Sequence, residues 1–359
     1  MEKALIAMSG GVDSSVAAYI MQRDGFSCVG ATMRLIGNEL LDTSEQSGCC
    51  SLEDVEDARS VAFRLQMPYY VFNFTGDFQE KVVDKFIRCY ECGATPNPCI
   101  DCNRYLKFEQ LLHRALVLGC DCVVTGHYAR VKQDPATGRY LLFQAVDKSK
   151  DQSYVLYTLT QKQLAYVRLP LGAMTKAEVR EIALTQGFVN AHKRDSQDIC
   201  FVPDGDYVAF MERYTGKQYT AGDFLDLQGN IVGQHAGAVG YTIGQRKGLG
   251  LAMGAPVYVC KKDMAKNTVT VGPNEALFSR TLRANDWNWF PFPTLTQPLR
   301  IQAKVRYRHS PQPATVYPEE HGFARVEFDE PQRAITTGQA VVLYDGELVV
   351  GGGTITEAL

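Results

Sequence analysis

The feature that most constrains the fold is a loop rich in glycine and serine, which reads MSGGVDSS over residues 8–15. It follows an apolar run, Lys3 to Met8, that predicts a buried strand, and it precedes a stretch from Val12 whose apolar residues recur at helical spacing. Glycines let a backbone wrap an anion, serines supply hydroxyl groups, and a helix N-terminus directs its amides and positive dipole end at the ligand. The sequence therefore predicts a phosphate-binding loop in a βαβ unit.

This loop differs from the two commonest nucleotide-binding motifs. It lacks both the Gly-Lys-Ser/Thr ending of a Walker A loop and the G-x-G-x-x-G pattern of a dinucleotide fold. A tight glycine turn without a ligand is the structural alternative. The pattern Ser-Gly-Gly-x-Asp-Ser resembles the PP-loop of the ATP pyrophosphatases, and this resemblance implies cleavage of ATP between its α and β phosphates.

Strand and helix patterns alternate through the first 125 residues. Apolar strand-like runs are followed by segments with helical periodicity, one of which begins at a capping signal formed by Ser51 and Asp54. Further strands are expected at 28–35, 69–74 and 122–124, and a further helix at 105–118. Such alternation builds a parallel sheet with helices on both faces. The N-terminal half is therefore predicted to be α/β.

The pattern changes after about residue 205, where Gly and Pro separate short β-rich runs and no long amphipathic helix is expected. Asp345-Gly346 between two apolar runs predicts a hairpin, so the C-terminus is expected to form a small barrel. We predict a doubly wound parallel-sheet domain at 1–205, a small central β-rich domain at 206–278 and a C-terminal β-barrel at 279–359.

Charge and cysteine content narrow the classes of function. The net charge is −3, from 37 basic and 40 acidic residues, so nucleic-acid binding would need a local basic patch. Residues 300–308 (RIQAKVRYR) alternate polar with mostly apolar side chains and, as one strand, would place four cations on one face. That face would suit phosphates, although a solvated outer face of a barrel is the alternative.

Eleven cysteines are an odd count, at a density too low for a disulfide-stapled secreted domain. No apolar run approaches the roughly 20 residues of a membrane span, and the N-terminal apolar run is too short for a secretory signal, so we expect a cytoplasmic protein. Cysteines in apolar runs are expected in the core: Cys28, Cys120, Cys122 and Cys260. Cys102 and Cys200 lie in polar, turn-rich segments, where a functional and a structural role both stay open.

Several longer segments then resemble one family from end to end. They are SGGVDSS, TPNPCIDCNRYLKF, TGHYAR, KDQSY, DSQDICF, GYTIGQRKGLG, KVRYRH and GQAVVLYDGELVVGGG. The chain is similar to the bacterial tRNA-specific 2-thiouridylases, which carry a PP-loop domain, a small central domain and a C-terminal β-barrel. The resemblance implies that ATP adenylates the C2 oxygen of the wobble uridine, position 34 of tRNA. A cysteine persulfide then delivers sulfur to C2, and AMP leaves.

The resemblance also implies roles for individual residues. Cys200 would carry the persulfide and Cys102 would be the nucleophile that frees its sulfur, with a disulfide between them as one route of release. The implied ATP contacts are Ala7, Met8, Ser9, Gly10, Gly11, Val12, Asp13, Ser14, Met33 and Gly126. Asn97, Pro98 and Cys99 would contact the target base, and the implied tRNA contacts are His127, Lys150, Asp151, Gln152, Arg306, Tyr307 and Gln339. For His127 a hydrogen-bonded structural role is the alternative.

The implied partners and cofactors follow. ATP is a substrate, Mg²⁺ is its expected counter-ion, and Asp13 would either help to bind that ion or hold the loop together. The expected partners are tRNA and a sulfur donor, either a cysteine desulfurase or a sulfur-relay protein, with no membrane. No tightly bound cofactor and no metal are expected.

The chain departs from the family pattern near its first functional cysteine. Some members carry Asp where Cys99 stands, and here an acid appears at Asp101, so the proton-transferring group is open. Two more cysteines complete the spacing C-x2-C-x6-C-x2-C, a possible zinc site, at Cys89, Cys92, Cys99 and Cys102. An iron–sulfur cluster on Cys99, Cys102 and Cys200 is a further alternative. Two other functions remain: a PP-loop ligase for a small metabolite, and a non-catalytic metal- or RNA-binding protein.

Overall fold

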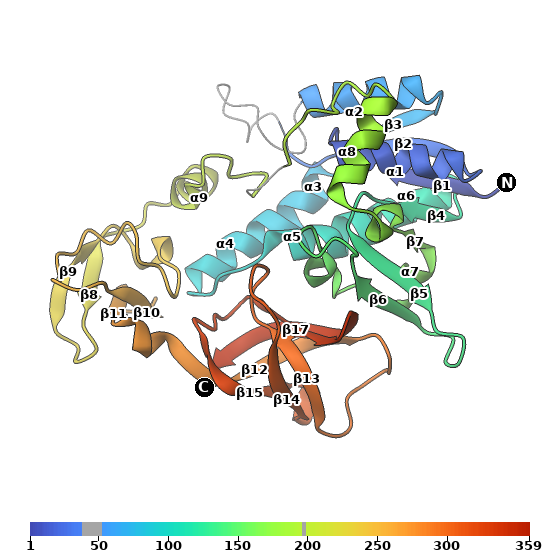
Figure 1. Ribbon diagram of the computed structural model, residues 1–359. Helices are drawn as coiled ribbons and strands as arrows, with labels where there is room; N and C mark the ends of the chain where they lie inside the picture. Colours follow the sequence, from blue (N-terminus) through green and yellow to red (C-terminus); the bar gives the residue numbers. More distant parts are fainter. Residues whose placement is uncertain (38–51, 196–198) are drawn as a thin grey trace. The chain divides into compact units, whose positions relative to one another are not determined.

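The computed structural model describes residues 1–37, 52–195 and 199–359, and the Ser51 capping signal lies outside them. The chain divides into two compact units (Figure 1). Unit 1 comprises Met1–Val83, Pro98–Gly205 and Gly346–Val350. Unit 2 comprises Asp84–Asn97, Asp206–Asp345 and Gly351–Leu359. Neither unit is one continuous stretch of chain.

Unit 1 is built on a five-stranded sheet of order β3-β2-β1-β4-β7, in which every pairing is parallel. Its strands are β1 (Lys3–Ala7), β2 (Ser27–Arg34), β3 (Tyr69–Asn73), β4 (Cys122–Val124) and β7 (Val167–Arg168). The middle residues of β1 are fully buried because helices cover the sheet. The predicted α/β fold is confirmed, and the strand order reverses at β1, where such sheets bind ligands.

The helices of unit 1 include the expected ones and several that the sequence reading did not identify. The longer helices are α1 (Val12–Arg23), α2 (Leu52–Arg64), the π-helical η3 (Cys102–Gln110), α6 (Leu111–Val117) and α8 (Lys176–Thr185). Shorter ones are α3 (Thr75–Phe78), η2 (Gln79–Val83), α5 (Pro98–Asp101), η4 (Ser153–Leu156), α7 (Gln161–Tyr166) and η5 (Pro170–Ala173). α8 begins at a capping box in which the Thr175 side chain and Glu178 satisfy each other's backbone amides.

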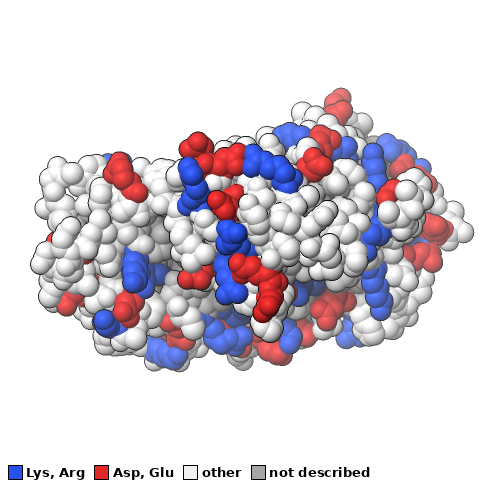
Figure 2. All heavy atoms as spheres, turned by 90° about the horizontal axis from the view of Figure 1, so that it is seen from below, with Lys and Arg blue, Asp and Glu red and all other residues white. Residues whose placement is uncertain are grey.

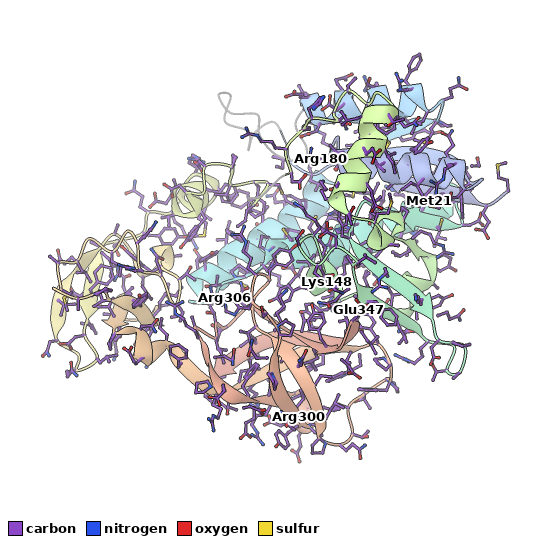
Figure 3. All side chains as sticks on the ribbon, viewed as in Figure 1. Met21, Lys148, Arg180, Arg300, Arg306 and Glu347 are labelled. Carbon is purple, nitrogen blue, oxygen red and sulfur yellow. The ribbon has the colours of Figure 1, made fainter. Side chains whose placement is uncertain are left out.

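Unit 1 also contains an antiparallel hairpin, β5 (Ala129–Gln133) and β6 (Tyr140–Gln144). The first residues of β17 (Leu348–Ala358) pair with β6, through Leu348 opposite Phe143. The Glu347 carboxylate supports this pairing through two ion pairs of 2.6 Å, one with Arg130 and one with Lys148. Figure 3 labels Glu347 and Lys148. The hairpin edge is thereby covered by residues from the far end of the chain.

In unit 2 a four-stranded sheet has the order β10-β11-β8-β9. Its strands are β8 (Gly222–Leu225), β9 (Ile231–His235), β10 (Tyr258–Asp263) and β11 (Thr268–Gly272), with the turns η6 (Ala238–Gly240) and η7 (Asn274–Leu277). Two helices belong to the same unit, α4 (Asp84–Glu91) and α9 (Tyr207–Thr215). They meet through Tyr90 and Tyr207, whose rings stack at 4.4 Å. The sequence predicts no long amphipathic helix after residue 205. The structure has a nine-residue helix there, α9, which the sequence did not predict.

The C-terminal strands close into a six-stranded barrel, as predicted. They are β12 (Phe278–Trp289), β13 (Leu299–Lys304), β14 (Gln312–Pro318), β15 (Ala324–Arg333), β16 (Ala340–Asp345) and β17, with the turn η8 (Glu320–Gly322). β12 pairs with both β15 and β17, and this second pairing closes the ring. The predicted hairpin at Asp345-Gly346 joins the neighbouring strands β16 and β17.

The structure corrects the expected basic strand at 300–308. β13 ends at Lys304, and residues 305–309 form bends and turns, so the four cations do not share one strand face. Arg300 is ion-paired with Asp329, and Figure 2 shows basic and acidic side chains intermixed on the face that it displays. Among the described residues, no helix has the length and apolar character needed to cross a bilayer.

Lys262, in β10, generates a prediction about pH. Its ammonium is buried without a hydrogen-bond partner among the described residues, 5.9 Å from the centre of the Tyr90 ring. Burial lowers the pKa of Lys262 to about 8, whereas an unfolded lysine keeps its proton to a pH of about 10.4. Between these values the unfolded state binds more protons, so the free energy of unfolding should rise with pH.

Between pH 7.5 and 10.5 we expect the free energy of unfolding of the wild type to rise by about 3 kcal/mol relative to that of Lys262→Met, which lacks the titrating group. Denaturant unfolding at pH 7.5, 9 and 10.5 would measure it. Lys261→Met, at the exposed neighbouring position, is the matched control and should keep the wild-type slope. Identical slopes for wild type and Lys262→Met would contradict the prediction.

Candidate functional site

The glycine-rich loop joins the carboxyl end of β1 to the start of α1, as predicted. Gly10 has a φ of +73°, and a Cβ there would lie 2.3 Å from the carbonyl oxygen of Asp54 in α2. Both the backbone conformation and the close approach of α2 therefore require glycine at this position. The unpaired N–H groups of the first turn of α1 face this loop, which is the geometry expected of an anion site.

The serine hydroxyls organise the loop. Ser14 Oγ accepts from the Ser9 backbone N–H at 3.2 Å and donates to the Gly11 carbonyl at 3.0 Å. Ser15 Oγ donates to the same carbonyl at 3.0 Å. These bonds fix the curvature of the loop, so the exposed Ser9 and the half-buried Gly11 lie at a preformed turn.

Two residues from other elements hold the loop in place, and the sequence reading identified neither. Thr32 in β2 donates through Oγ1 to the Met8 carbonyl at 2.7 Å. Asn190 is buried and donates through Nδ2 to the Gly10 carbonyl at 2.8 Å and to Ser15 Oγ at 3.0 Å. The loop is therefore anchored from both sides.

The other residues expected to contact ATP come from neighbouring strands. Met33 lies near the end of β2, beside Thr32, and Gly126 follows β4. A Cβ on Gly126 would lie 2.8 Å from the Ser14 backbone nitrogen, so this loop packs tightly on the start of α1. The structure thus brings the expected ATP residues, Ala7–Ser14, Met33 and Gly126, to the carboxyl ends of β1, β2 and β4.

Asp13 is held by two side chains from distant parts of unit 1. The Lys176 ammonium lies 2.7 and 2.9 Å from its two carboxylate oxygens, and Tyr128 donates its hydroxyl at 2.8 Å. Burial and the neighbouring Asp13 carboxylate raise the pKa of Tyr128 far above its usual range, so its hydroxyl keeps its proton. Asp13 therefore links the first turn of α1 to the start of α8 and to Tyr128, which directly precedes β5.

Lys176 also contacts a second carboxylate, that of Asp195, at 2.8 Å. Two further cations reach Asp195: Lys150 at 2.9 Å and Arg180 at 3.2 Å. Burial raises the pKa of Asp195, but the hydrogen bonds from Lys176 and Lys150 outweigh it, so its pKa lies below the usual range. Asp195 is thus ionised, and it precedes the segment that leads to Cys200.

The two cysteines predicted to be functional both lie in unit 1. Cys102 is the first residue of η3, and Cys200 is followed by Phe201, whose ring meets Phe78 of α3 edge-on at 5.7 Å. α3 packs against η3, so the segments that carry the two cysteines share α3 as a neighbour. Both residues are half-buried.

The cysteines predicted to be structural behave differently. Cys28, Cys120 and Cys122 are buried, and Cys260 is half-buried. Burial raises the pKa of both Cys28 and Cys122 to about 11, so these thiols stay protonated at neutral pH. The expectation of core cysteines is confirmed for the first three and holds only partly for Cys260.

The zinc spacing is divided between the units. Cys89 and Cys92 belong to unit 2, whereas Cys99, in α5, and Cys102 belong to unit 1. Within residues 1–37, 52–195 and 199–359, no three or more His, Cys, Asp or Glu side chains gather as metal ligands would. The structure therefore adds no support to the zinc or iron–sulfur alternatives.

Of the four residues expected near tRNA in unit 1, two are buried and two are half-buried. His127 is buried and its Nδ1 lies 2.7 Å from Thr125 Oγ1; burial, then the nearby Lys107, holds its pKa well below the usual range. Asp151 is buried and accepts from the Ala145 N–H at 2.9 Å, and Gln152 accepts from the Tyr128 N–H at 2.9 Å. Lys150 is half-buried and is paired with Asp195.

The three residues of unit 2 that are expected to contact tRNA have different surroundings. The Arg306 guanidinium donates to the carbonyls of Ile243 and Ala334, each at 3.1 Å, and to Thr336 Oγ1 at 2.7 Å. Tyr307 is exposed. Gln339 donates to the Thr95 carbonyl at 2.8 Å, and thereby holds the segment that leads into Asn97, Pro98 and Cys99.

Sequence reasoning missed Thr32, Tyr128, Lys176 and Asn190. Lys176 had a local signal, because it directly follows the N-cap residue Thr175 of a capping box and is therefore the first residue of a helix. Asn190 and Thr32 had none, since each acts by a contact to a loop far away along the chain.

Comparisons with known proteins agree with one another. The family model described as the tRNA methyl transferase HUP domain matches residues 2–204, the PRC-barrel domain model of the same name matches 208–273, and an aminomethyltransferase β-barrel domain model matches 279–355. A relative from Clostridioides difficile named tRNA-specific 2-thiouridylase MnmA is 49% identical over 359 residues, 100% of this chain and 99% of that protein. One of the same name from Moorella thermoacetica is 51% identical, over 98% of each chain.

Among solved structures, a 4-thiouridine synthetase in complex with RNA and ATP matches 56% of this chain and 45% of its own, with 20% identity and a TM-score of 0.34. That score is too low to support an argument from the fold.

The Lys176 contacts generate a prediction about ATP binding. Lys176→Met should weaken ATP binding at least about tenfold, because the Asp13 carboxylate would face the ATP phosphates without its counter-charge. Lys176→Arg should retain most of the affinity. Lys148→Met removes an exposed ammonium of the same charge and should leave the Kd unchanged. Calorimetric titration with ATP would measure all three, and an unchanged Kd in Lys176→Met would contradict the prediction.

Proposed function

Because the chain belongs to the tRNA-specific 2-thiouridylase family, we propose that its PP-loop and its two half-buried cysteines replace the C2 oxygen of the wobble uridine of tRNA with sulfur. The observation that carries this proposal is the match at about 50% identity over the whole chain. The chain is a tRNA-modifying sulfurtransferase. The comparisons favour neither a small-molecule ligase nor a non-catalytic binding protein.

In the first step the C2 oxygen attacks the α phosphorus of ATP, the bond to the β phosphate breaks, and pyrophosphate leaves. The backbone amides of residues 9–14 and the start of α1 receive the phosphates, and Met33 and Gly126 border the nucleotide. Adenylation converts the C2 oxygen, a poor leaving group, into part of AMP, which is a good one. This is the use of ATP that the loop geometry supports.

Mg²⁺ in this proposal accompanies the ATP phosphates. The Asp13 carboxylate is occupied by Lys176 and Tyr128, so it does not fit the role of a direct ligand to the ion. Of the two roles expected for Asp13, the contacts support that of holding the loop. No step is therefore assigned to Mg²⁺ through a protein ligand.

In the second step a persulfide on Cys200 supplies the sulfur. The Cys102 thiolate attacks Sγ of Cys200, the bond between that atom and the terminal sulfur breaks, and a Cys102–Cys200 disulfide forms. The terminal sulfur takes its electron pair to C2 of the uridine, and AMP leaves. An external thiol then reduces the disulfide, and a cysteine desulfurase or a sulfur-relay protein reloads Cys200.

The target base lies beside Asn97, Pro98 and Cys99 in this proposal. Lys150 and Tyr307 contact the tRNA directly. The internal contacts of His127, Asp151, Gln152, Arg306 and Gln339 shape the loops that receive it. A base in a stem-loop must leave its stack before its C2 edge is accessible.

The roles of the two cysteines can be separated experimentally. We expect ³⁵S transfer from a labelled persulfide donor to tRNA to require ATP and to fall at least about a thousandfold in both Cys102→Ala and Cys200→Ala, because each removes a reacting sulfur. Cys200→Ala should also lose the protein-bound label, whereas Cys102→Ala should retain it on Cys200.

Cys260→Ala is the matched control, since this half-buried thiol has a raised pKa and no proposed role. Label in 2-thiouridine from Cys200→Ala at the wild-type rate would contradict the persulfide assignment. AMP formation with a small acceptor and never with tRNA would instead favour the ligase.

A further inference from the structure

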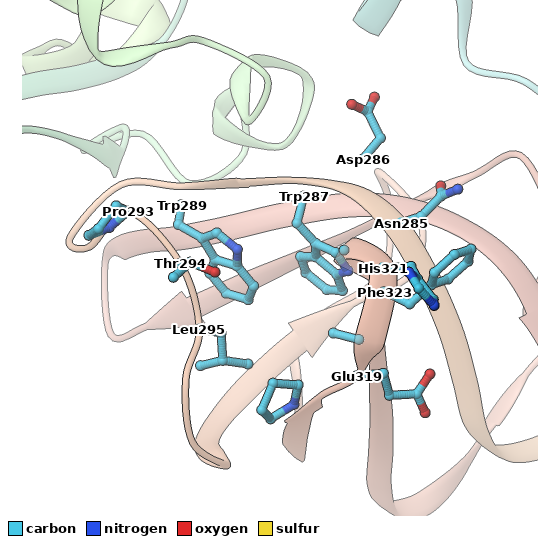
Figure 4. A pocket seen from close by; sticks show the side chains of 13 residues that line it. Asn285, Asp286, Trp287, Trp289, Pro293, Thr294, Leu295, Glu319, His321 and Phe323 are labelled. Atoms are coloured by element: carbon cyan, nitrogen blue, oxygen red, sulfur yellow. The ribbon is translucent and has the colours of Figure 1, made fainter.

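A cavity of about 470 Å³ lies in the C-terminal barrel, wholly within unit 2, and the mechanism above makes no use of it. Figure 4 shows the indoles of Trp287 and Trp289 beside Phe323, with Leu295 below them. The polar groups at its border are carboxylates, an amide, a hydroxyl and an imidazole, and no lysine, arginine or cysteine lines it. Its size and aromatic lining are those of a site for a small planar molecule.

The two indoles are held in a fixed arrangement. Their rings stack with centroids 4.9 Å apart and planes 9° from parallel, and the Phe292 ring lies 5.5 Å from that of Trp289, tilted by 31°. Trp287 donates its Nε1–H to the Ala284 carbonyl at 3.0 Å, which fixes the ring. Across from them, a Cβ on Gly351 or Gly353 would come within 2.9 Å of an indole atom. The aromatic surface is therefore preformed.

The backbone around the cavity is unusual on both sides. Asp286 and His321 are non-glycine residues with φ of 51° and 58°, in the left-handed region. Asp286 lies in an irregularity of the β12–β17 pairing between Asn285 and Asn288. Strained backbone of this kind persists where the surrounding structure enforces it, and it concentrates at ligand sites.

Cations lie next to the cavity. The Arg283 guanidinium sits 4.1 Å from the Phe323 ring centre and 2.6 Å from Glu319, and Arg325 is 3.9 Å from the same carboxylate. Glu319 is thereby paired with two arginines, which lowers the negative charge at the mouth of the cavity, where Asp286 is the other carboxylate. An aromatic surface with arginines beside it suits a base that stacks while its phosphate stays outside.

We propose that this cavity binds an unstacked nucleobase of the tRNA substrate, other than the uridine that is thiolated. The proposal rests on the tRNA-modifying function above. Because no cysteine lines the cavity, a base held there cannot receive sulfur at that place. The cavity is thus a second base-binding site, which binds the tRNA by stacking on one base, while the base that is thiolated binds in the PP-loop domain.

Trp287 and Trp289 are the two tryptophans of the chain, so tryptophan fluorescence reports on this cavity alone. Unmodified tRNA should quench the emission saturably, with a midpoint equal to the Kd from filter binding, and should protect the indoles from acrylamide. Nucleoside monophosphates should quench it at millimolar concentrations, whereas ribose 5-phosphate, which lacks a base, should not.

Substitutions test the same point through kinetics. Trp287→Ala should raise the KM for tRNA about tenfold, the usual effect of losing one stacked base, and leave kcat within about twofold. Trp287→Phe keeps an aromatic ring and should behave like wild type within about threefold. Circular dichroism establishes that each variant is folded, and Tyr258→Ala, an aromatic residue of β10 in the same unit but outside the cavity, is the matched control.

The proposal is overturned if saturating tRNA leaves the emission and its acrylamide quenching unchanged while thiolation proceeds. That result leaves the proposed function intact, whereas absence of ATP-dependent thiolation with normal tRNA quenching would refute the function and not the cavity. Quenching by a lysine-rich peptide but not by tRNA would also overturn it, because the occupant would then be a cationic side chain of a protein.

Discussion

One ammonium group, that of Lys176, holds two carboxylates that lie far apart in the sequence. It contacts Asp13 at the start of α1 and Asp195 before the Cys200 segment, at 2.7 and 2.8 Å. The Lys176 side chain is buried, and a buried cation is costly without an anionic partner, so the two carboxylates stabilise its position. The glycine-rich loop and Asp195, five residues before Cys200, thus share one positive charge.

The fold of unit 1 could be predicted because its signals are local. Apolar runs, helical periods and the glycine turn at Gly10 each act within a few residues, and they identify β1, α1, β2 and the parallel sheet. The Lys176–Asp13 contact joins residues 163 positions apart, and nothing near either residue specifies the other. The residues that form the loop were therefore predictable, and those that fasten it were not.

Unit 2 shows the same limit. The barrel follows from short β-rich runs and the Asp345-Gly346 hairpin, but alternation in 300–308 suggested a longer strand than β13. The prediction of that strand failed because Arg306 turns inward to three acceptors of its own unit. Likewise, the approach of Gly351 and Gly353 to two indoles depends on pairing between β12 and β17, which no local pattern records.

The division of the chain has a consequence for its synthesis. The polypeptide passes between the units five times, and residues 346–350 of unit 1 emerge from the ribosome after most of unit 2. Until then the outer edge of β6 has no partner, and an open strand edge invites pairing with other chains. The parallel sheet of unit 1 can form once residues 1–168 are made, whereas its β5–β6 hairpin gains its last strand only after residues 346–350 are made.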